Sequence, residues 1–184
     1  MPAALLVMDF QVGVVGRFTG SDEVVARART AVDAARAHGV PVVFVRIGFR
    51  DGYPEVSPRN RAFSTVAGRA DMGEDEPGTQ VIGELEPRRD ETVVVKRRVS
   101  AFAGSDLAVV LRAAGVDHLV LSGISTSGVV LSTLREAADC DYRLTVLADA
   151  CLDGDPEVHR VLTEKVFPRQ ADVVAVDEWV ASLG

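Results

Sequence analysis

The feature that most limits the fold of this chain is the alternation of short, continuous apolar runs with helical patterns. The runs are rich in Val and Leu and do not alternate with polar residues, which is typical of strands buried on both faces of a sheet. Repeated strand–helix units require parallel strands joined by right-handed crossovers. The pattern therefore predicts an α/β domain, a three-layer α/β/α sandwich with one six-stranded parallel sheet. The predicted strands are 4–8, 40–45, 92–95, 118–121, 144–147 and 173–176.

The segments between these runs carry helical periodicity. Apolar residues recur at helical spacing in 25–35, 107–114, 131–138 and 158–162. Polar residues that favour helix starts precede the first two segments, and glycine follows each of them at Gly39 or Gly115. Glycine is strongly favoured just beyond the last turn of a helix, so both ends are well marked.

Length and charge bound the class of protein. The 184 residues suit one domain, 1–184, with a full core. The net charge of -7 and the lack of a basic block argue against a nucleic-acid partner. No apolar run approaches the roughly 20 residues of a membrane helix, and the first residues form no basic leader. Cys140 and Cys151 do not suggest a disulfide framework, so we expect a reduced, cytoplasmic protein with no membrane partner.

The segment 47–90 breaks the alternation of strands and helices. It is rich in Gly, Pro, Asp, Glu and Arg, and it shows little periodicity. A stretch of this length without regular structure is usually functional or mobile. It is either a plain surface excursion or a lid over the strand ends, and we favour the lid without preferring any one of its arginines. The arginines available there for an anionic substrate are Arg50, Arg59, Arg61 and Arg69.

Three polar features follow predicted strands. Asp9 ends the first strand, Lys96 ends the third, and a turn that opens with glycine, 123–129, follows the fourth. Open parallel sheets bind ligands beyond the carboxyl ends of their strands. Each feature alone has an ordinary structural explanation, such as a turn aspartate or a lysine that reaches water. Together, at the ends of three strands, they indicate one site.

Several segments match the motifs of one family in order and spacing. Residues 6–11, Leu-Val-Met-Asp-Phe-Gln, resemble a strand that ends in Asp-x-Gln, and residues 96–102, Lys-Arg-Arg-Val-Ser-Ala-Phe, resemble a lysine followed by Ser-Ala-Phe. Residues 123–133 resemble Gly-Val-x-Thr-x-x-Cys-Val-x-x-Thr. Over nearly its whole length the chain therefore resembles the isochorismatase-like hydrolases, also called the cysteine hydrolase superfamily.

The resemblance implies a fold, a site and an assembly. The strand order would be 3-2-1-4-5-6, with Asp9 as general acid/base, Lys96 as its partner, and a cis peptide bond between Ile124 and Ser125. It also implies a small-molecule substrate, no cofactor, and a homodimer or homotetramer. The candidate substrate-binding residues are Gln11, Phe102, Ile124, Ser125 and Thr126.

The chain departs from the family at the nucleophile. The position of the family's cysteine is occupied by Val129, whose side chain cannot attack a substrate. Neither cysteine of the chain is in a segment that would replace it, and no histidine is recognisably placed to activate Ser125 or Ser127. The zinc-binding histidines of nicotinamidase relatives are also missing, because no histidine occurs between His38 and His118, so we predict no metal.

The missing cysteine leaves non-covalent chemistry. Isochorismatases have glycine at that position, and they protonate a vinyl ether so that water traps the resulting oxocarbenium ion. The leading prediction is a hydrolase that acts on a small anionic metabolite, with Asp9 as acid and Lys96 as its partner. Val129 is bulkier than glycine, which argues against isochorismate itself. The alternatives are a degenerate family member that only binds a small molecule or a partner, and a purely structural subunit.

Overall fold

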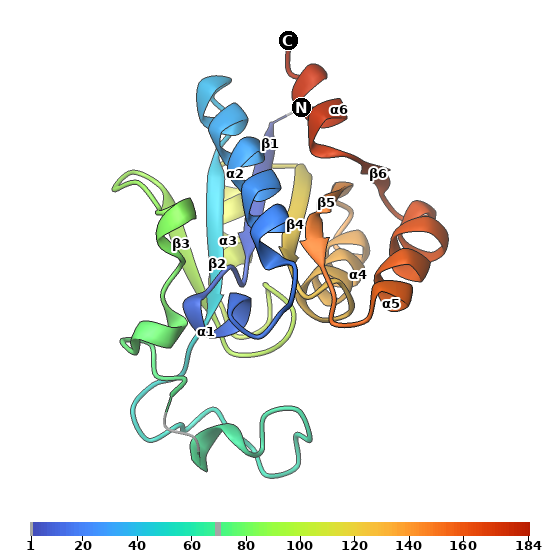
Figure 1. Cartoon of the computed structure of the whole chain (residues 1–184). Coiled ribbons are helices and arrows are strands. Elements are labelled where there is room, and N and C mark those ends of the chain that lie inside the picture. Colours follow the sequence, from blue (N-terminus) through green and yellow to red (C-terminus); the bar gives the residue numbers. More distant parts are fainter. Residues whose placement is uncertain (1, 69–70) are drawn as a thin grey trace.

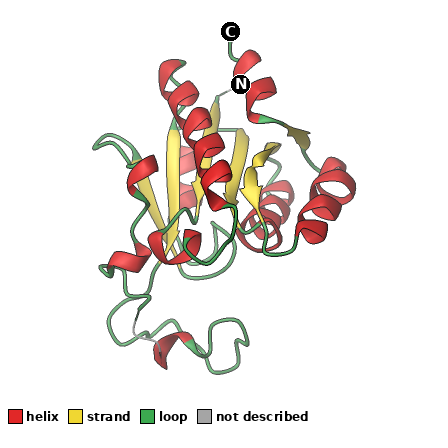
Figure 2. Cartoon of the chain, in the orientation of Figure 1, coloured by secondary structure: helices red, strands yellow, loops and turns green. Residues whose placement is uncertain are grey.

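The computed structural model describes residues 2–68 and 71–184, which form a parallel sheet with helices on both faces (Figures 1 and 2). The strands of this described part lie in the order β3-β2-β1-β4-β5-β6. The predicted three-layer α/β/α fold and the strand order 3-2-1-4-5-6 are therefore confirmed. The strands are β1 (Ala3–Met8), β2 (Val42–Ile47), β3 (Thr92–Lys96), β4 (His118–Ile124), β5 (Arg143–Leu152) and β6 (Asp172–Val174).

Different helices cover the two faces of the sheet. Helices α2 and α6 pack on one face, and α3 and α4 pack on the other (Figure 1). Within the described residues, no helix combines the length and the apolar character needed to cross a bilayer. The α-helices are α1 (Val12–Val15), α2 (Ser21–Ala37), α3 (Leu107–Ala113), α4 (Leu131–Asp139), α5 (Pro156–Val161) and α6 (Val176–Ala181). Shorter helical turns are η1 (Val66–Gly68), η2 (Pro77–Thr79), η3 (Gly83–Leu85), η4 (Thr126–Val130), η5 (Leu162–Val166) and η6 (Phe167–Arg169).

Strand β1 shows why the apolar runs of this sequence are continuous. Its successive side chains point to opposite faces of the sheet. Leu5 and Val7 join the core beneath α2, whereas Leu6 and Met8 join the core beneath α3 and α4. All four side chains are at most 1% exposed. A central strand with two buried faces has no position for a polar residue until it leaves the sheet, and the first such position is Asp9.

The structure differs from the sequence prediction at the ends of the sheet. Strand β5 continues to Leu152, beyond the predicted end at Leu147. Val176 was predicted to end a strand, but it begins α6 instead. The helix start is fixed by two hydrogen bonds: Glu178 accepts from the Ala175 N–H at 3.0 Å, and Asp149 accepts from the Val176 N–H at 2.8 Å. These acceptors satisfy backbone donors that a helix start leaves free.

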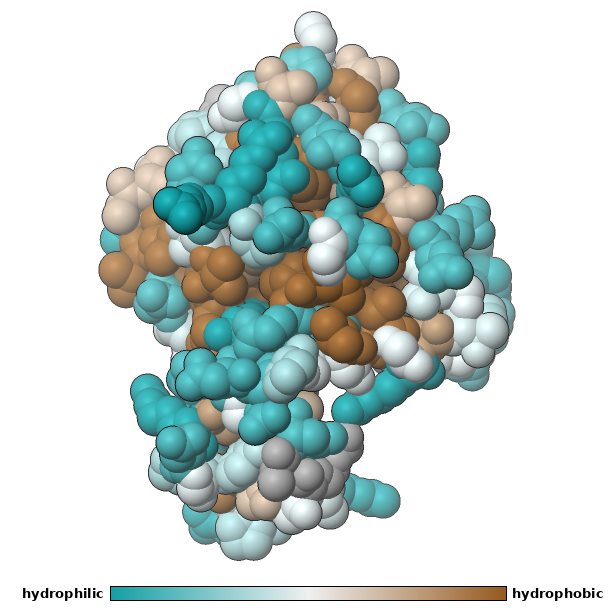
Figure 3. Space-filling view, turned by 60° about the vertical axis from the view of Figure 1, so that its left-hand side comes forward, coloured by the Kyte–Doolittle hydropathy of each residue, from teal (hydrophilic) through white to brown (hydrophobic). Residues whose placement is uncertain are grey.

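The excursion, residues 47–90, extends beyond the carboxyl ends of the strands (Figure 1). Its surface is largely hydrophilic, while apolar side chains gather on the body above it (Figure 3). Inside, it has a small apolar cluster of its own, built on Ile47, Phe49 and Val66, with Phe63 and Met72 packed against them. The excursion is therefore a packed segment, and its few apolar residues hold it together.

Two arginines, the buried Arg97 and the half-buried Arg46, anchor the base of the excursion. Arg97, which follows β3, donates to the Gly48 carbonyl at 2.6 Å and to the Glu74 carboxylate. Arg46 of β2 donates to the Glu74 carbonyl at 2.8 Å. Charge-assisted bonds of this kind are stronger than neutral ones, so the excursion is held close to the strand ends.

Candidate active site

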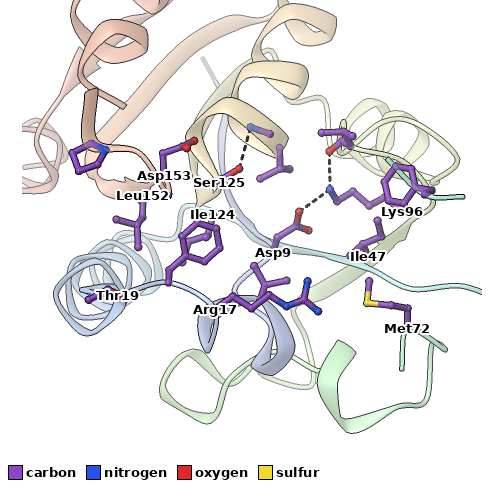
Figure 4. Close-up of a pocket in the computed structure, with 18 residues that line it drawn as sticks. Asp9, Arg17, Thr19, Ile47, Met72, Lys96, Ile124, Ser125, Leu152 and Asp153 are labelled. Atoms are coloured by element: carbon purple, nitrogen blue, oxygen red, sulfur yellow. Dashed lines mark hydrogen bonds and ion pairs between the residues drawn. The ribbon is translucent and has the colours of Figure 1, made fainter. Parts of the chain in front are cut away.

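Asp9 lies where β1 leaves the sheet. Its backbone is left-handed, with φ of 60°, a conformation that Asp adopts more readily than most residues. Its N–H still donates to the Val45 carbonyl at 2.8 Å, so the turn remains attached to β2. The carboxyl group projects into a cavity beyond the strand ends (Figure 4).

The structure brings Lys96 to Asp9 across the sheet. Lys96 ends β3, and β2 separates that strand from β1. Its Nζ lies 2.8 Å from Asp9 Oδ2 and donates to the Val99 carbonyl at 2.7 Å (Figure 4). The Lys96 side chain is only 1% exposed, so this ion pair is shielded from water. These are the two residues that the sequence placed at separate strand ends.

The two carboxyl oxygens of Asp9 have different surroundings. Oδ2 accepts from Lys96, whereas Oδ1 is buried and has no hydrogen-bond partner among the described residues. Burial raises the pKa of Asp9 above its usual range, and the charge and hydrogen bond of Lys96 oppose that rise. A proton on this carboxyl group therefore belongs on Oδ1, because Oδ2 is occupied by the ammonium group.

The strand ends and the excursion enclose a cavity of about 740 Å³. This volume is in the range of pockets that bind small molecules. Most of its wall is apolar, and Phe63 and Met72 of the excursion form part of it. The polar and charged side chains in the described wall are Asp9, Arg17, Thr19, Lys96, Ser125 and Asp153.

The turn after β4 supplies another side of the cavity. The peptide bond between Ile124 and Ser125 is cis, as the resemblance implied, and both residues line the cavity. Ser125 Oγ accepts from the Gly128 N–H at 3.2 Å. A Cβ atom at Gly128 would lie 2.7 Å from this oxygen, so a side chain there would displace it. Glycine at 128 therefore permits the bond that begins η4.

Val129, at the position that the resemblance assigns to the nucleophile, lines the cavity. It is 2% exposed and belongs to the core beneath α3 and α4. Gly123 makes room for it, because a Cβ atom at 123 would lie 3.2 Å from Val129 Cγ1 and 2.8 Å from the Met8 carbonyl oxygen. The site thus presents an aliphatic group, which has no lone pair with which to attack a substrate.

The two thiols do not replace the missing nucleophile. Cys151 is buried, and burial raises its pKa to about 12, so the thiolate is scarce at neutral pH. Cys140 is exposed at the end of α4. The described residues that line the cavity include neither a cysteine nor a histidine. Likewise, no three His, Cys, Asp or Glu side chains in the described ranges form a group that could hold a metal ion.

Three predicted substrate contacts lie outside the described cavity wall. The Gln11 amide group donates to the carbonyls of Ile47 and Thr79, both at 2.8 Å, and accepts from the Ile47 N–H at 2.9 Å. It therefore ties the end of β1 to β2 and to the excursion.

The other two outlying residues also have structural partners. The Phe102 ring lies 6.1 Å from the Tyr142 ring, between centroids. Thr126 Oγ1 is buried and lies 2.8 Å from His159 Nδ1. Of the five candidate substrate contacts, only Ile124 and Ser125 are in the described cavity wall.

Three of the arginines proposed for the lid, Arg50, Arg59 and Arg61, are outside the described cavity wall. Arg50 pairs with Glu55 at 2.5 Å, and neither Arg59 nor Arg61 is in the described wall. Arg69 lies outside the described residues. The wall instead contains Arg17, which the sequence analysis missed because an exposed loop residue carries no periodic signal.

Asp153 was missed as well, although a signal was present. Like Asp9, it directly follows an apolar strand, and such a position in a parallel sheet faces the ligand side. Its Oδ2 accepts from the Ser127 N–H at 2.7 Å, at the start of η4.

Comparison with known proteins agrees with this geometry. The isochorismatase domain model matches residues 3–178. The chain belongs to the isochorismatase family. Two relatives and one solved structure of this family match the chain over nearly its whole length.

The chain is 34% identical to the isochorismatase family protein YecD of Escherichia coli O157:H7, over 98% of this chain and 95% of YecD. It is 32% identical to the ureidoacrylate amidohydrolase RutB of Stutzerimonas stutzeri (strain A1501), over 98% of this chain and 79% of RutB. An isochorismatase family structure from Burkholderia thailandensis superposes with a TM-score of 0.89 at 27% identity, over 99% of this chain and 95% of that one.

Proposed function

We propose that this isochorismatase-family hydrolase acts on a small anionic metabolite by general-acid catalysis from Asp9, without a covalent enzyme intermediate. The observation that carries the proposal is the buried, unpartnered Oδ1 of Asp9 in a cavity whose nucleophile position holds Val129. One oxygen of this carboxyl group is held by Lys96, and the other is free to hold and deliver a proton.

The favoured reaction is the hydrolysis of a vinyl ether that carries a carboxylate. Asp9 Oδ1 transfers its proton to the terminal alkene carbon, which gives an oxocarbenium ion and leaves Asp9 ionised. Water adds to that cation, and its released proton returns to Asp9. The hemiketal then collapses to an alcohol and a keto acid, which is pyruvate for a 1-carboxyvinyl ether. None of these reaction steps needs a nucleophile on the enzyme.

Lys96 has two effects on this acid. It fixes the carboxyl group through Oδ2, and its charge limits the rise of the Asp9 pKa, which keeps the protonated group a usable acid. A positioned general acid contributes typically about 10²–10⁴-fold in rate. Lys96 is thus a positioning residue for Asp9.

Covalent amide hydrolysis is less well supported. The relative RutB is named an amidohydrolase. In this chain, however, the described cavity wall offers no thiol, and Ser125 Oγ accepts from the Gly128 N–H with one of its two lone pairs. The absence of an activating histidine from the same wall also disfavours a serine nucleophile.

The second candidate function is binding without catalysis, which the aliphatic Val129 favours. The retained pair of Asp9 and Lys96 argues against it, because a buried ion pair is no more stabilising than apolar packing of similar volume. A chain that only bound a ligand would have no stability reason to keep this pair.

The test is pyruvate release from a panel of 1-carboxyvinyl ethers of cyclic alcohols, measured by NADH consumption with lactate dehydrogenase. We expect turnover by the unaltered protein and a loss of at least 100-fold in Asp9→Asn. Asp51→Asn, an exposed change in the excursion, is the matched control and should retain full activity. Equal turnover by Asp9→Asn would refute the acid role, and no turnover of any ether by the unaltered protein would favour the binding function.

A further inference from the structure

Among the charged side chains of the described cavity wall, Arg17 is the one without a partner in the described structure. Four charged side chains are in its described wall, and two of them, Asp9 and Lys96, neutralise each other. Asp153 is stabilised by the Ser127 N–H at the start of a helical turn. Arg17 forms no ion pair with any residue in the described ranges 2–68 and 71–184. Its charge is therefore available to a ligand.

Arg17 is held at the cavity by its backbone. It follows α1, and its N–H donates to the Val14 carbonyl at 3.0 Å. In Figure 4 its guanidinium group extends between Asp9 and Met72. The cation thus lies at the edge of the cavity that Asp9 also lines.

We propose that Arg17 is a specificity-determining residue that binds the carboxylate of a monoanionic substrate. This inference rests on the proposed function in one respect, namely that the Asp9 cavity is the active site. The planar guanidinium fork matches a carboxylate through two parallel hydrogen bonds. The body of the substrate lies against the apolar wall, and its reacting end meets Asp9 Oδ1.

The charge balance favours one negative charge over two. Asp9 and Asp153 are in the same wall as Arg17, and both repel anions when ionised. Outside the Asp9–Lys96 pair, a phosphate dianion would meet only one cation, Arg17, and it would also meet the carboxylate of Asp153. The wall is otherwise mainly apolar, with Phe18 and Leu152 on the body and Phe63 and Met72 on the excursion. The ligand class is therefore a carboxylate with a ring or other apolar body.

The test measures binding of three probes of similar shape: benzoate, its neutral analogue benzamide, and phenyl phosphate. Ligand-observed NMR titration gives Kd for each probe. The variants are Arg17→Gln, Arg17→Lys and the control Arg59→Gln, which removes the same charge from an exposed arginine outside the described wall. Arg17 is exposed, so its replacement leaves the core intact.

We expect the unaltered protein to bind benzoate more tightly than phenyl phosphate. Arg17→Gln should weaken benzoate binding at least tenfold and change benzamide binding less than twofold. Arg17→Lys should give an intermediate loss, since it keeps the charge without the fork. Arg59→Gln should leave both Kd values unchanged.

Two results would overturn the role of Arg17. One is benzoate binding that Arg17→Gln leaves intact, and the other is no benzoate binding by the unaltered protein at millimolar concentrations. The Asp9→Asn variant separates this proposal from the proposed function. If it still turns over a vinyl ether while Arg17→Gln loses benzoate, the acid role fails and the carboxylate site remains. If Asp9→Asn is inactive and Arg17→Gln binds benzoate normally, the acid role remains and the carboxylate site fails.

Discussion

Asp9 contacts Lys96 through one carboxyl oxygen only, at 2.8 Å, and leaves its other oxygen buried without a partner in the described structure. A plain structural ion pair would have both oxygens hydrogen-bonded, since an unsatisfied buried acceptor costs about 1–3 kcal/mol. The arrangement leaves Oδ1 available to a proton that can pass to a ligand or to a donor group of a ligand. Whether Oδ1 is protonated or bound to a ligand should depend on pH and on the charge of Lys96.

The pH dependence of turnover should report the Asp9 carboxyl group. Burial raises its pKa above the usual value, and the proposed reaction needs the protonated form. We expect kcat/KM for a vinyl ether to be level at acidic pH and to fall tenfold per pH unit above the pKa of Asp9. Rates measured from pH 4 to 9 test this, and a profile that rises with pH would contradict the acid role.

The same raised pKa affects stability in a defined direction. The folded protein binds the Asp9 proton more tightly than the unfolded chain, so this stabilising contribution is complete below about pH 3.9 and is lost as pH rises through the folded pKa. Asp9→Asn should lack this contribution. Urea unfolding of both proteins between pH 4 and 8 measures this: the stability of the unaltered protein should fall relative to that of Asp9→Asn as pH rises.

Removing Lys96 should destabilise the protein more at high pH than at low pH. Lys96→Met leaves Asp9 buried without its cation, a change that costs about 3–5 kcal/mol where the carboxylate is ionised. It also removes the group that lowers the Asp9 pKa, so acid restores the neutral form and much of the stability. The double variant Asp9→Asn with Lys96→Met should be more stable at pH 8 than Lys96→Met alone. Additive losses would show that the two groups are not coupled.

Cys151 should resist alkylation in the folded protein. Its thiol is buried with a pKa raised to about 12, whereas Cys140 is exposed. Iodoacetamide at pH 8 should label Cys140 alone, and Cys151 should react only after unfolding. Peptide mass spectrometry distinguishes the sites, and rapid labelling of Cys151 would reopen the question of a displaced nucleophile.

The same reagent tests whether position 129 faces the cavity. Val129 is 2% exposed but lines the cavity, so the new thiol in Val129→Cys should be alkylated faster than a buried thiol outside the cavity wall. Benzoate should slow the reaction if it occupies the cavity. Val130→Cys is the matched control, because Val130 is fully buried and is outside the cavity wall. Equal protection of both thiols would show that the cavity is closed at 129.

Gly123 should tolerate no side chain. Its Cβ would lie 2.8 Å from the Met8 carbonyl oxygen, which the sheet holds in place, so Gly123→Ala must shift the backbone beside Asp9. We expect a loss of about 1–3 kcal/mol in the free energy of unfolding. Gly83→Ala, where nothing lies within 4 Å of the new Cβ, should stay within about 0.5 kcal/mol.

The sequence was sufficient to predict the parts of this protein that depend on periodic burial. The alternation of apolar runs and helical patterns predicted the parallel sheet, because each central strand is buried on both faces. Placing polar residues at the strand ends predicted that Asp9 and Lys96 lie near each other. The helix that begins at Val176 was missed because its start depends on the Asp149 and Glu178 side chains rather than on apolar spacing.

The remainder of the site depends on loop geometry, which has no period. Arg17 and Asp153 reach the cavity from loops, while Gln11 turns its amide group to Ile47 and Thr79 instead of to the cavity. The position of Gln11 in the Asp-x-Gln motif did not indicate that its side chain links β1 to β2 and to the excursion. The sequence also offered the arginines of the excursion as partners for an anionic substrate, but Arg50 already forms an ion pair with Glu55.

In this fold, the ion pair and part of the cavity wall come from different segments, namely the sheet and the anchored excursion. Asp9 and Lys96 lie at strand ends of the sheet, whereas Phe63 and Met72 belong to a segment with its own packing that is anchored at its base. Substitutions at these two positions should reshape the cavity without disturbing the Asp9–Lys96 pair. A lineage with this layout can therefore acquire new substrates by altering one surface segment while its chemistry stays the same.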